Sequence, residues 1–257
     1  MSACGQPFAE SDGRTAEPFD MLLKTGKAGS KSHRVAPFDY LDKEAMHKAV
    51  IFDLGRVLVD FDFRRGYRAL EGLCPYDARE IPRRLAASGL VERLETGLVE
   101  PRDFVAQLSG VLDLHVDYDQ FCRLWSSIFT EPLIPESLLA GLAERYRLVL
   151  LSNTNAIHFE MLRHRLPALR HFHRSVLSYE VKAMKPRPEM YRAALEAAGC
   201  RPEECFYTDD IPAYVEAARA LGIDAVQFES AAQIERELAA RGIDWQEKCR
   251  AQEGAPG

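Results

Sequence analysis

The chain has 257 residues, of which 47% are apolar and 28% are charged, and its formal net charge is −6. This composition is ordinary for a globular protein, and the length fits one large domain or one domain with a sizeable insertion. Acidic and basic residues are interspersed, which argues against nucleic acid or an anionic membrane as a partner, because phosphate-rich surfaces need a concentrated basic face. No apolar run approaches the ~20 residues that span a bilayer. We expect a soluble cytoplasmic protein.

The N-terminal segment, residues 1–45, differs in composition from the rest of the chain. It is rich in Gly, Ser, Pro, Lys and Asp and lacks the apolar region of a secretory signal, so we expect a disordered extension. Met46 stands just before the first predicted strand, and a start at that residue is the alternative. Six cysteines occur without a CxxC pair. We expect free thiols, although Cys200 and Cys205 could be bridged or bind a metal.

Four apolar runs with turn residues at their ends predict buried parallel strands, and a weaker run adds a fifth. Helical patterns separate the last four, which is typical of a βαβ sheet covered on both faces. The fold class is therefore α/β, with a Rossmann-like parallel sheet. The expected strands are residues 49–54, 147–152, 174–178 (the weaker run), 204–209 and 224–228, and the expected helices are 155–166, 188–199, 213–222 and 231–242.

The connection between the first two of these strands is far longer than one crossover needs. Hydrophobic residues recur in it at helical spacing, which predicts an inserted subdomain of about four helices. Ligands of open α/β sheets bind at the carboxyl ends of the strands, where a lid would exclude water and select the substrate. The expected parts are a core (46–62 and 131–240), a lid (63–130, with helices at 63–73, 78–94, 101–112 and 117–129) and a C-terminal tail (241–257).

Polar residues stand at or shortly after the ends of four predicted strands. Because the carboxyl ends of parallel strands meet at one edge of the sheet, three carboxylates, a hydroxyl and a lysine should converge there. Carboxylates bind a hard cation such as Mg²⁺, and a lysine with a serine completes a cradle for a phosphoryl group. An aspartate in such a site can attack phosphorus. The residues are Asp53, Ser152, Asn153, Lys185, Asp209 and Asp210.

Four segments resemble, in this order, the motifs of the haloacid dehalogenase (HAD) superfamily: IFDLGRVLVDFD, LLSNTN, MKPRPEMY and YTDDIPAYVEAARALG. The resemblance covers about residues 48–228 and includes a helical cap of the C1 type in the insertion. The first two motifs are similar to those of small bacterial phosphatases that act on α-D-glucose 1-phosphate. The resemblance implies a Mg²⁺-dependent phosphatase, monomeric or homodimeric, that hydrolyses small phosphorylated metabolites, with sugar 1-phosphates ahead of the rest.

The resemblance also implies a role for each residue of the cluster. Asp53 would be the nucleophile that forms an aspartyl-phosphate, and it would bind Mg²⁺ together with the Gly55 carbonyl. Lys185 would neutralise nucleophile and phosphate, Asp210 would ligate the metal, and Asp209 would hold a metal-bound water. Taken singly, such residues have ordinary alternatives as turn formers, helix caps or solvated side chains. The phosphoryl oxygens would be bound by Ser152 and Asn153.

Phosphatases of this family usually carry a second Asp two residues after the nucleophile, where this chain has Gly55. That Asp protonates the leaving alcohol and then activates water, a contribution of typically ~10²–10⁴-fold. Its absence suits sugar 1-phosphates, because an anomeric hydroxyl needs little protonation. Asp60 or Asp62 could instead serve as the acid, unless they begin the hinge to the cap and interact with Arg64 and Arg65. In a third interpretation, the protein is catalytically impaired and binds a phosphorylated ligand.

Two further interpretations concern other chemistry. A 2-haloacid dehalogenase on the same fold would attack carbon and need no Mg²⁺, so the intact acid pair Asp209-Asp210 argues against it. His158 could face the substrate, or it could be an exposed or helix-capping residue. His171 and His173 are expected at the surface rather than in a metal site, because no other ligand stands near them in sequence.

Overall fold

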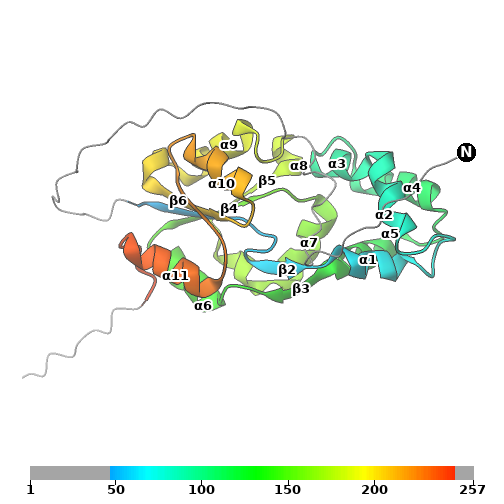
Figure 1. Ribbon diagram of the computed structural model, residues 1–257, viewed down its shortest axis with the longest axis horizontal. Coiled ribbons are helices and arrows are strands. Elements are labelled where there is room, and N and C mark those ends of the chain that lie inside the picture. The colour runs from blue at the N-terminus through cyan, green and yellow to red at the C-terminus, as the bar shows by residue number, and fades with distance from the viewer. Residues whose placement is uncertain (1–46, 247–257) are drawn as a thin grey trace, which may run out of the picture. The chain divides into compact units, whose positions relative to one another are not determined.

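The computed structural model describes residues 47–246, so the predicted N-terminal extension, 1–45, and the end of the predicted tail lie outside the described residues. The central strands are β1 (Ala49–Phe52), β4 (Arg147–Ser152), β5 (Arg174–Leu177), β6 (Cys205–Asp209) and β7 (Asp224–Gln227). They form one parallel sheet in the order β5-β4-β1-β6-β7 (Figure 1). This confirms the predicted α/β fold.

Helices pack on both faces of the sheet (Figure 1): on one face α6 (Glu136–Ala143), α7 (Ala156–Arg165) and α11 (Ala231–Ala240), and on the other α9 (Pro188–Ala198) and α10 (Pro212–Arg219). Two layers form because consecutive residues of a strand point to opposite faces. In β1, Val50 and Phe52 join the first apolar cluster, whereas Ala49 and Ile51 join the second. Burial on both faces explains the continuous apolar run of this strand. Short turns of 3-10 helix lie at η3 (Pro167–His171) and η4 (Pro202–Glu204).

The predicted insertion, residues 63–130, carries five α-helices, where about four were predicted. They are α1 (Phe63–Leu70), α2 (Glu80–Ser88), α3 (Leu90–Glu95), α4 (Pro101–Leu112) and α5 (Tyr118–Trp125), followed by the turn η2 (Ser126–Ile128). We call α1–α5 the inserted helices. The predicted helix 78–94 is split at Gly89, whose left-handed φ of 64° ends α2. A third apolar cluster lies among the inserted helices and includes Phe104, Phe121 and Trp125.

An antiparallel ribbon that the prediction missed links the inserted helices to the sheet. It consists of β2 (Val59–Phe61) and β3 (Phe129–Pro132). Since β2 directly precedes α1 and β3 directly follows η2, both passages of the chain run through this ribbon. The inserted helices therefore end just before the predicted boundary at residue 130. β2 alternates apolar and acidic residues but is only three residues long, and β3 shows no alternation.

A second junction between the inserted helices and the core lies at Gly97, in the loop between α3 and α4. The Lys182 ammonium, next to α8 (Ser178–Val181), donates to the Gly97 carbonyl at 2.7 Å. Gly97 has a φ of 59°, and a Cβ at this position would run into the carbonyl oxygen of Tyr179. Both the backbone conformation and the close approach therefore require glycine.

His158 forms the junction beside the ribbon and does not serve as an exposed residue. Its ring is buried and stacks on Trp125 with centroids 5.7 Å apart. The Asn155 amide lies 3.1 Å from Nδ1, and the Trp125 carbonyl lies 3.2 Å from Nε2. Because Nδ1 accepts from the amide, the ring proton is on Nε2 and is donated to Trp125. Burial lowers the pKa of His158 to about 4, so the ring is neutral.

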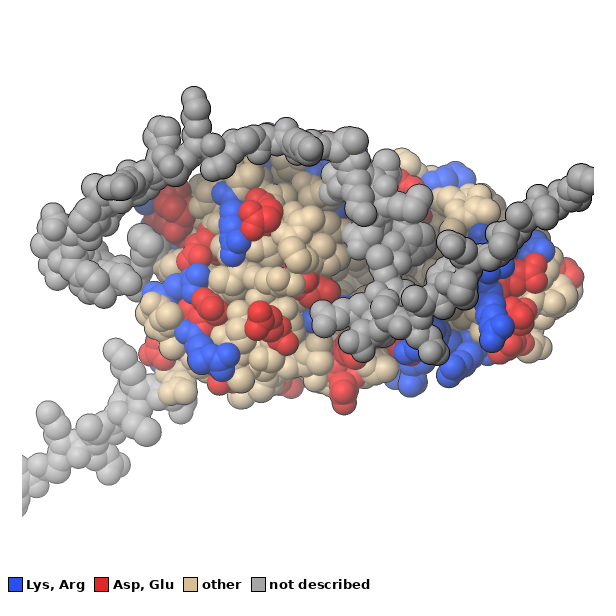
Figure 2. Space-filling model, viewed as in Figure 1, with Lys and Arg blue, Asp and Glu red and all other residues tan. Residues whose placement is uncertain are grey.

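Charged side chains of both signs are intermixed on the face of the described residues that Figure 2 shows. Within residues 47–246, no helix has both the length and the apolar character needed to cross a bilayer. The first residues of the predicted tail are attached to the core. Arg241 pairs with Asp224 at 2.6 Å, and Arg145 pairs with Asp244 at 2.5 Å.

We expect His158 to make the protein less stable as the pH falls from 6.5 towards 4. The folded pKa is lowered, so in this window the unfolded chain binds a proton that the folded chain does not, which costs up to about 1.4 kcal/mol per pH unit. In His158→Gln, Tm measured between pH 7 and 4.5 should fall less steeply than in the wild type. The matched control is His164→Gln, an exposed position on the same helix, which should keep the wild-type slope. Equal slopes in all three proteins would contradict this account.

Candidate active site

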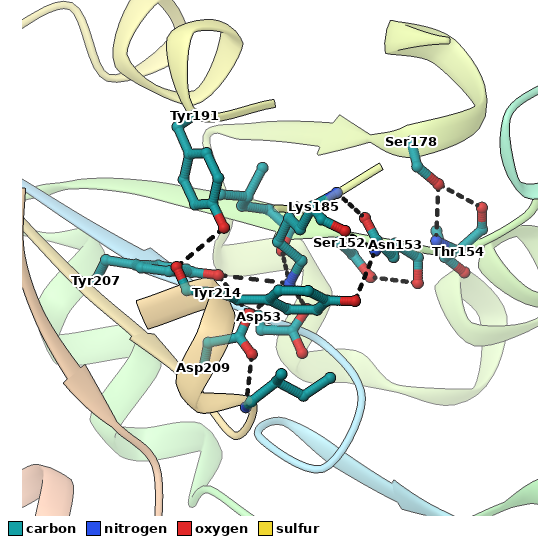
Figure 3. Close-up of polar contacts among 12 residues, drawn as sticks. Asp53, Ser152, Asn153, Thr154, Ser178, Lys185, Tyr191, Tyr207, Asp209 and Tyr214 are labelled. Carbon is teal, nitrogen blue, oxygen red and sulfur yellow. Dashed lines mark hydrogen bonds and ion pairs between the residues drawn. The ribbon is translucent and has the colours of Figure 1, made fainter. Parts of the chain in front are cut away.

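Lys185 is the centre of the predicted cluster, and the structure brings its expected partners together around it (Figure 3). Its Nζ donates to Asp53 Oδ1 at 2.7 Å, to Asp209 Oδ2 at 2.5 Å and to the Leu151 carbonyl at 3.2 Å. The three ammonium hydrogens therefore each have an acceptor. Only 1% of the side chain is exposed. Burial alone would lower the pKa of Lys185, but the charges of Asp209 and Asp53 raise it above its usual value, so the ammonium stays charged.

Besides Lys185, two further donors bind the Asp209 carboxylate. Its Oδ2 also accepts the hydroxyl of Tyr207, and its Oδ1 accepts the backbone N–H of Ile211 at 2.9 Å. The carboxylate is fully buried at the end of β6. Tyr207 was missed as a site residue because it lies in an apolar strand. Its position two residues before Asp209 places both side chains on one face of that strand, which was the available signal.

Three carboxylates gather at this edge of the sheet. Asp53, Asp209 and Asp210 each have an oxygen within 4.8 Å of the others. Burial raises the pKa of Asp53, which Lys185 opposes and Asp209 reinforces. Burial and the charge of Asp209 also raise the pKa of Asp210, to about 6. Three acids against one lysine leave excess negative charge, which a divalent cation would offset.

Asn153 positions the Lys185 loop. Its Oδ1 accepts the backbone N–H of Lys185 at 2.8 Å, and its Nδ2 donates to the carbonyl of the same residue at 3.1 Å. The side chain of Asn153 is thus engaged with the Lys185 backbone. Ser152 is buried at the end of β4, and its hydroxyl makes a long contact of 3.4 Å with the Asn153 carbonyl. The Ser152 hydroxyl is therefore better placed than the Asn153 side chain to contact a phosphoryl oxygen. The phosphoryl contacts of both residues stay predictions.

The space that a side chain at position 55 would occupy is filled. A Cβ on Gly55 would lie 2.7 Å from Cε1 of Phe61, a residue of β2. The guanidinium of Arg56 lies over the same ring, 5.0 Å from its centroid. Gly55 therefore belongs to a packed turn between β1 and the ribbon. The absent family aspartate leaves no gap behind it.

Asp60 and Asp62 are used locally at the start of the inserted helices. The Asp60 carboxylate accepts the backbone N–H of Phe61 at 2.9 Å. Asp62 is the N-cap of α1, and its carboxylate pairs with the Arg64 guanidinium at 2.8 Å. The side-chain hydrogen bond from Arg64 holds the pKa of Asp62 below its usual value. These contacts favour the interpretation of both acids as part of the hinge.

Tyr214 is a second site residue that the sequence prediction missed. Its ring centroid lies 5.1 Å from Lys185 Nζ, and its hydroxyl accepts from Asn153 Nδ2 at 3.4 Å. The hydroxyl of Tyr191 donates to the Tyr214 carbonyl at 2.9 Å. Tyr214 lies in the first turn of α10, which begins two residues after Asp210, and this place directly behind the acid pair was the signal that could have revealed it.

The remaining histidine and cysteine candidates have separate partners. His171 contacts Glu136 at 3.0 Å, and His173 accepts the backbone N–H of Leu148 at 3.0 Å. Cys200 and Cys205 are free thiols with sulfur atoms 3.4 Å apart. In the described part of the chain, the acid trio at positions 53, 209 and 210 is the group suited to a metal.

The family model of the haloacid dehalogenase-like hydrolases matches residues 47–222. The chain belongs to this hydrolase family. It is 27% identical over 200 residues to the D-ribitol-5-phosphate phosphatase of Bacteroides thetaiotaomicron, covering 75% of this chain and 97% of the relative. It is also 27% identical over 213 residues to a phosphatase of Mycobacterium tuberculosis, covering 76% of this chain and 94% of the relative.

Solved structures of HAD enzymes have the same fold. A HAD family enzyme of Bacteroides thetaiotaomicron, solved with magnesium and inorganic phosphate, has a TM-score of 0.65 and 30% identity, covering 72% of this chain and 95% of that chain. An L-2-haloacid dehalogenase with 20% identity has a TM-score of 0.54 and shares the fold alone. The HAD resemblance is confirmed at the level of the superfamily. The relatives named above do not include a glucose 1-phosphate phosphatase.

We expect Gly55→Ala to destabilise the protein because its new methyl group would meet the Phe61 ring. Overpacking of this kind costs about 1–3 kcal/mol. In a Phe61→Leu background the same substitution should cost less. Chemical denaturation of the wild type, the two single variants and the double variant measures this difference in the free energy of unfolding. Gly110→Ala, in a helix with open space around the glycine, is the matched control and should be neutral or stabilising. Additive effects of the first two substitutions would show that the ring does not fill the space at position 55.

Proposed function

We propose that the chain is a Mg²⁺-dependent phosphatase of small phosphorylated metabolites, with sugar and polyol phosphates as the main class. The observation that carries the proposal is the buried Lys185 ammonium shared between Asp53 and Asp209 at the carboxyl edge of the sheet. Two of its relatives are named phosphatases. One neighbouring structure holds magnesium and phosphate.

The acid residues fit a hard divalent cation. Asp53 and Asp210, with the carbonyl of Gly55, would hold Mg²⁺, because their carboxylates converge and carry raised pKa values that a nearby cation would lower. Asp209 is less suited to direct ligation, because both of its oxygens already accept hydrogen bonds. It would hold a metal-bound water, as the family resemblance implies. The bound cation would neutralise charge on the phosphoryl group.

Asp53 would act as the nucleophile. Its Oδ1 is paired with Lys185, so Oδ2 is the oxygen available to attack phosphorus. A bond forms between Oδ2 and phosphorus while the bond to the leaving alcohol breaks, which gives an aspartyl-phosphate. Water then attacks this phosphorus and the bond to Oδ2 breaks, which releases Asp53 and inorganic phosphate. Solvent supplies the proton that the alkoxide takes up and accepts the proton that the water loses. Before the attack, Lys185 favours the ionised form of the buried carboxylate, and during transfer it balances charge on the phosphoryl oxygens.

Gly55 bears on which substrates react well. With no acid at this position, the leaving oxygen departs with little help, and leaving groups of low basicity are favoured. This favours glucose 1-phosphate and similar 1-phosphates, in agreement with the predicted resemblance. The relative that is named for D-ribitol 5-phosphate adds polyol phosphates to the candidates, although their primary alcohol is a poorer leaving group.

Two other functions are weaker candidates. A catalytically impaired binding protein is favoured by Gly55, whereas the retained group of Asp53, Lys185 and Asp210 favours catalysis. A 2-haloacid dehalogenase is disfavoured by the convergent acids, because carbon displacement has no use for a metal. Likeness to dehalogenase structures extends to the fold alone.

Asp53→Asn should abolish phosphate release. We expect Mg²⁺-dependent release by the wild type from a panel of glucose 1-phosphate, glucose 6-phosphate, D-ribitol 5-phosphate and p-nitrophenyl phosphate, and a loss of at least about 10³-fold in the variant. EDTA should suppress the wild-type rate, and Asp113→Asn, the same change in an exposed helix end, should leave it unaltered. A wild type no faster than Asp53→Asn on every substrate would rule out the phosphatase function and leave a binding role.

The rates should depend strongly on the leaving group. We expect kcat for p-nitrophenyl phosphate and glucose 1-phosphate to exceed kcat for glucose 6-phosphate by about 10-fold or more, because an absent general acid penalises the more basic alcohol. Steady-state kinetics at saturating substrate separate this effect from binding. Equal kcat values across the panel would mean either that another group supplies the proton or that a step after release of the alcohol limits the rate. A pre-steady-state burst of p-nitrophenol occurs only in the second case and so distinguishes the two.

A further inference from the structure

Tyr214 covers the side of the cluster where Lys185 and Asn153 meet. Figure 3 shows its ring beside Lys185, with the hydroxyl directed toward Asn153. The ring centroid is 5.1 Å from the ammonium, a distance at which cation–π attraction operates. The residue is only half-buried, unlike Tyr207 and Tyr191, which lie in the interior. Tyr214 is therefore the tyrosine of this group that stands at the accessible edge of the site.

The hydroxyl of Tyr214 has a proton to donate. The Lys185 backbone N–H bonds to Asn153 Oδ1, which fixes the orientation of the amide, so the group facing Tyr214 is Nδ2. Nδ2 is a donor, and the Tyr214 oxygen is its acceptor. Within residues 47–246, the Tyr214 hydroxyl proton has no hydrogen-bond acceptor. The Tyr207 proton, by contrast, goes to Asp209.

We propose that the Tyr214 hydroxyl is a donor to the phosphoryl group, bonding a non-bridging oxygen beside Lys185. This rests on the proposed phosphatase function. The donor is held in place before substrate arrives, because Asn153 contacts the hydroxyl and the ring lies against the Lys185 ammonium. A fixed donor next to an ammonium adds to the stabilisation of charge on the equatorial oxygens during phosphoryl transfer.

Tyr214→Phe tests the proposal, because it keeps the ring over Lys185 and removes only the donor. We expect the affinity for inorganic phosphate in the presence of Mg²⁺, measured by titration calorimetry, to fall about 10–100-fold, as for one hydrogen bond to a charged group. For p-nitrophenyl phosphate and glucose 6-phosphate, kcat/KM should fall by a common factor, because both substrates present the same non-bridging oxygens.

Tyr191→Phe is the matched control, because it removes a hydroxyl that bonds the backbone of Tyr214 without facing the substrate. It should change phosphate affinity less than about 3-fold. Unchanged affinity in Tyr214→Phe, or an equal loss in both variants, would overturn the proposal. A loss confined to glucose 6-phosphate would also overturn it, since that pattern assigns Tyr214 to protonation of the leaving group. If the wild type binds no phosphate in the presence of Mg²⁺, the proposed phosphatase function is contradicted. If the wild type is active and Tyr214→Phe has the same phosphate affinity and rates, only the proposed donor role of Tyr214 is contradicted.

Discussion

The buried ammonium of Lys185 is the interaction on which the rest of the site depends. Each isolated ion in a protein interior costs several kcal/mol of lost hydration, which a pair offsets only with good geometry and further hydrogen bonds. Here Asp53 and Asp209 share one cation, and Tyr207 and the Ile211 backbone supply the additional donors to Asp209. The arrangement still carries more negative than positive charge. That imbalance makes the edge of the sheet suited to a metal and a phosphoryl group together.

The topology of the sheet determines which groups can meet there. β1 lies between β4 and β6, so the residues that follow these three strands are neighbours whatever their distance in sequence. Lys185 comes from a loop instead of a strand, and a loop has no ladder to fix it. The amide of Asn153 supplies that constraint by bonding the backbone N–H and carbonyl of Lys185. A residue of the second motif thus positions the lysine of the third.

Sequence reasoning predicted the sheet and the convergence of Asp53, Lys185 and Asp209, because buried strands and their polar ends produce a strong local pattern. It missed what depends on packing across the fold. Tyr207 lies in an apolar run and gains its polar role only from the carboxylate beside it. The ribbon was missed because β2 alternates over only three residues and β3 does not alternate at all. Gly89, by contrast, was visible in the sequence, and the error there was to extend a helix through a glycine that ends it.

The packing at Gly55 changes the meaning of the missing acid. An empty position could be restored by one substitution, but Phe61 already occupies the space, and its ring belongs to the ribbon that leads to the inserted helices. An aspartate at position 55 would displace that ring and disturb the junction between core and inserted helices. The absence of a side chain at position 55 is therefore part of how this turn packs against the ribbon. A phosphatase with such a site must obtain its rate from charge stabilisation by Lys185 and the cation, and from leaving groups that depart with little help.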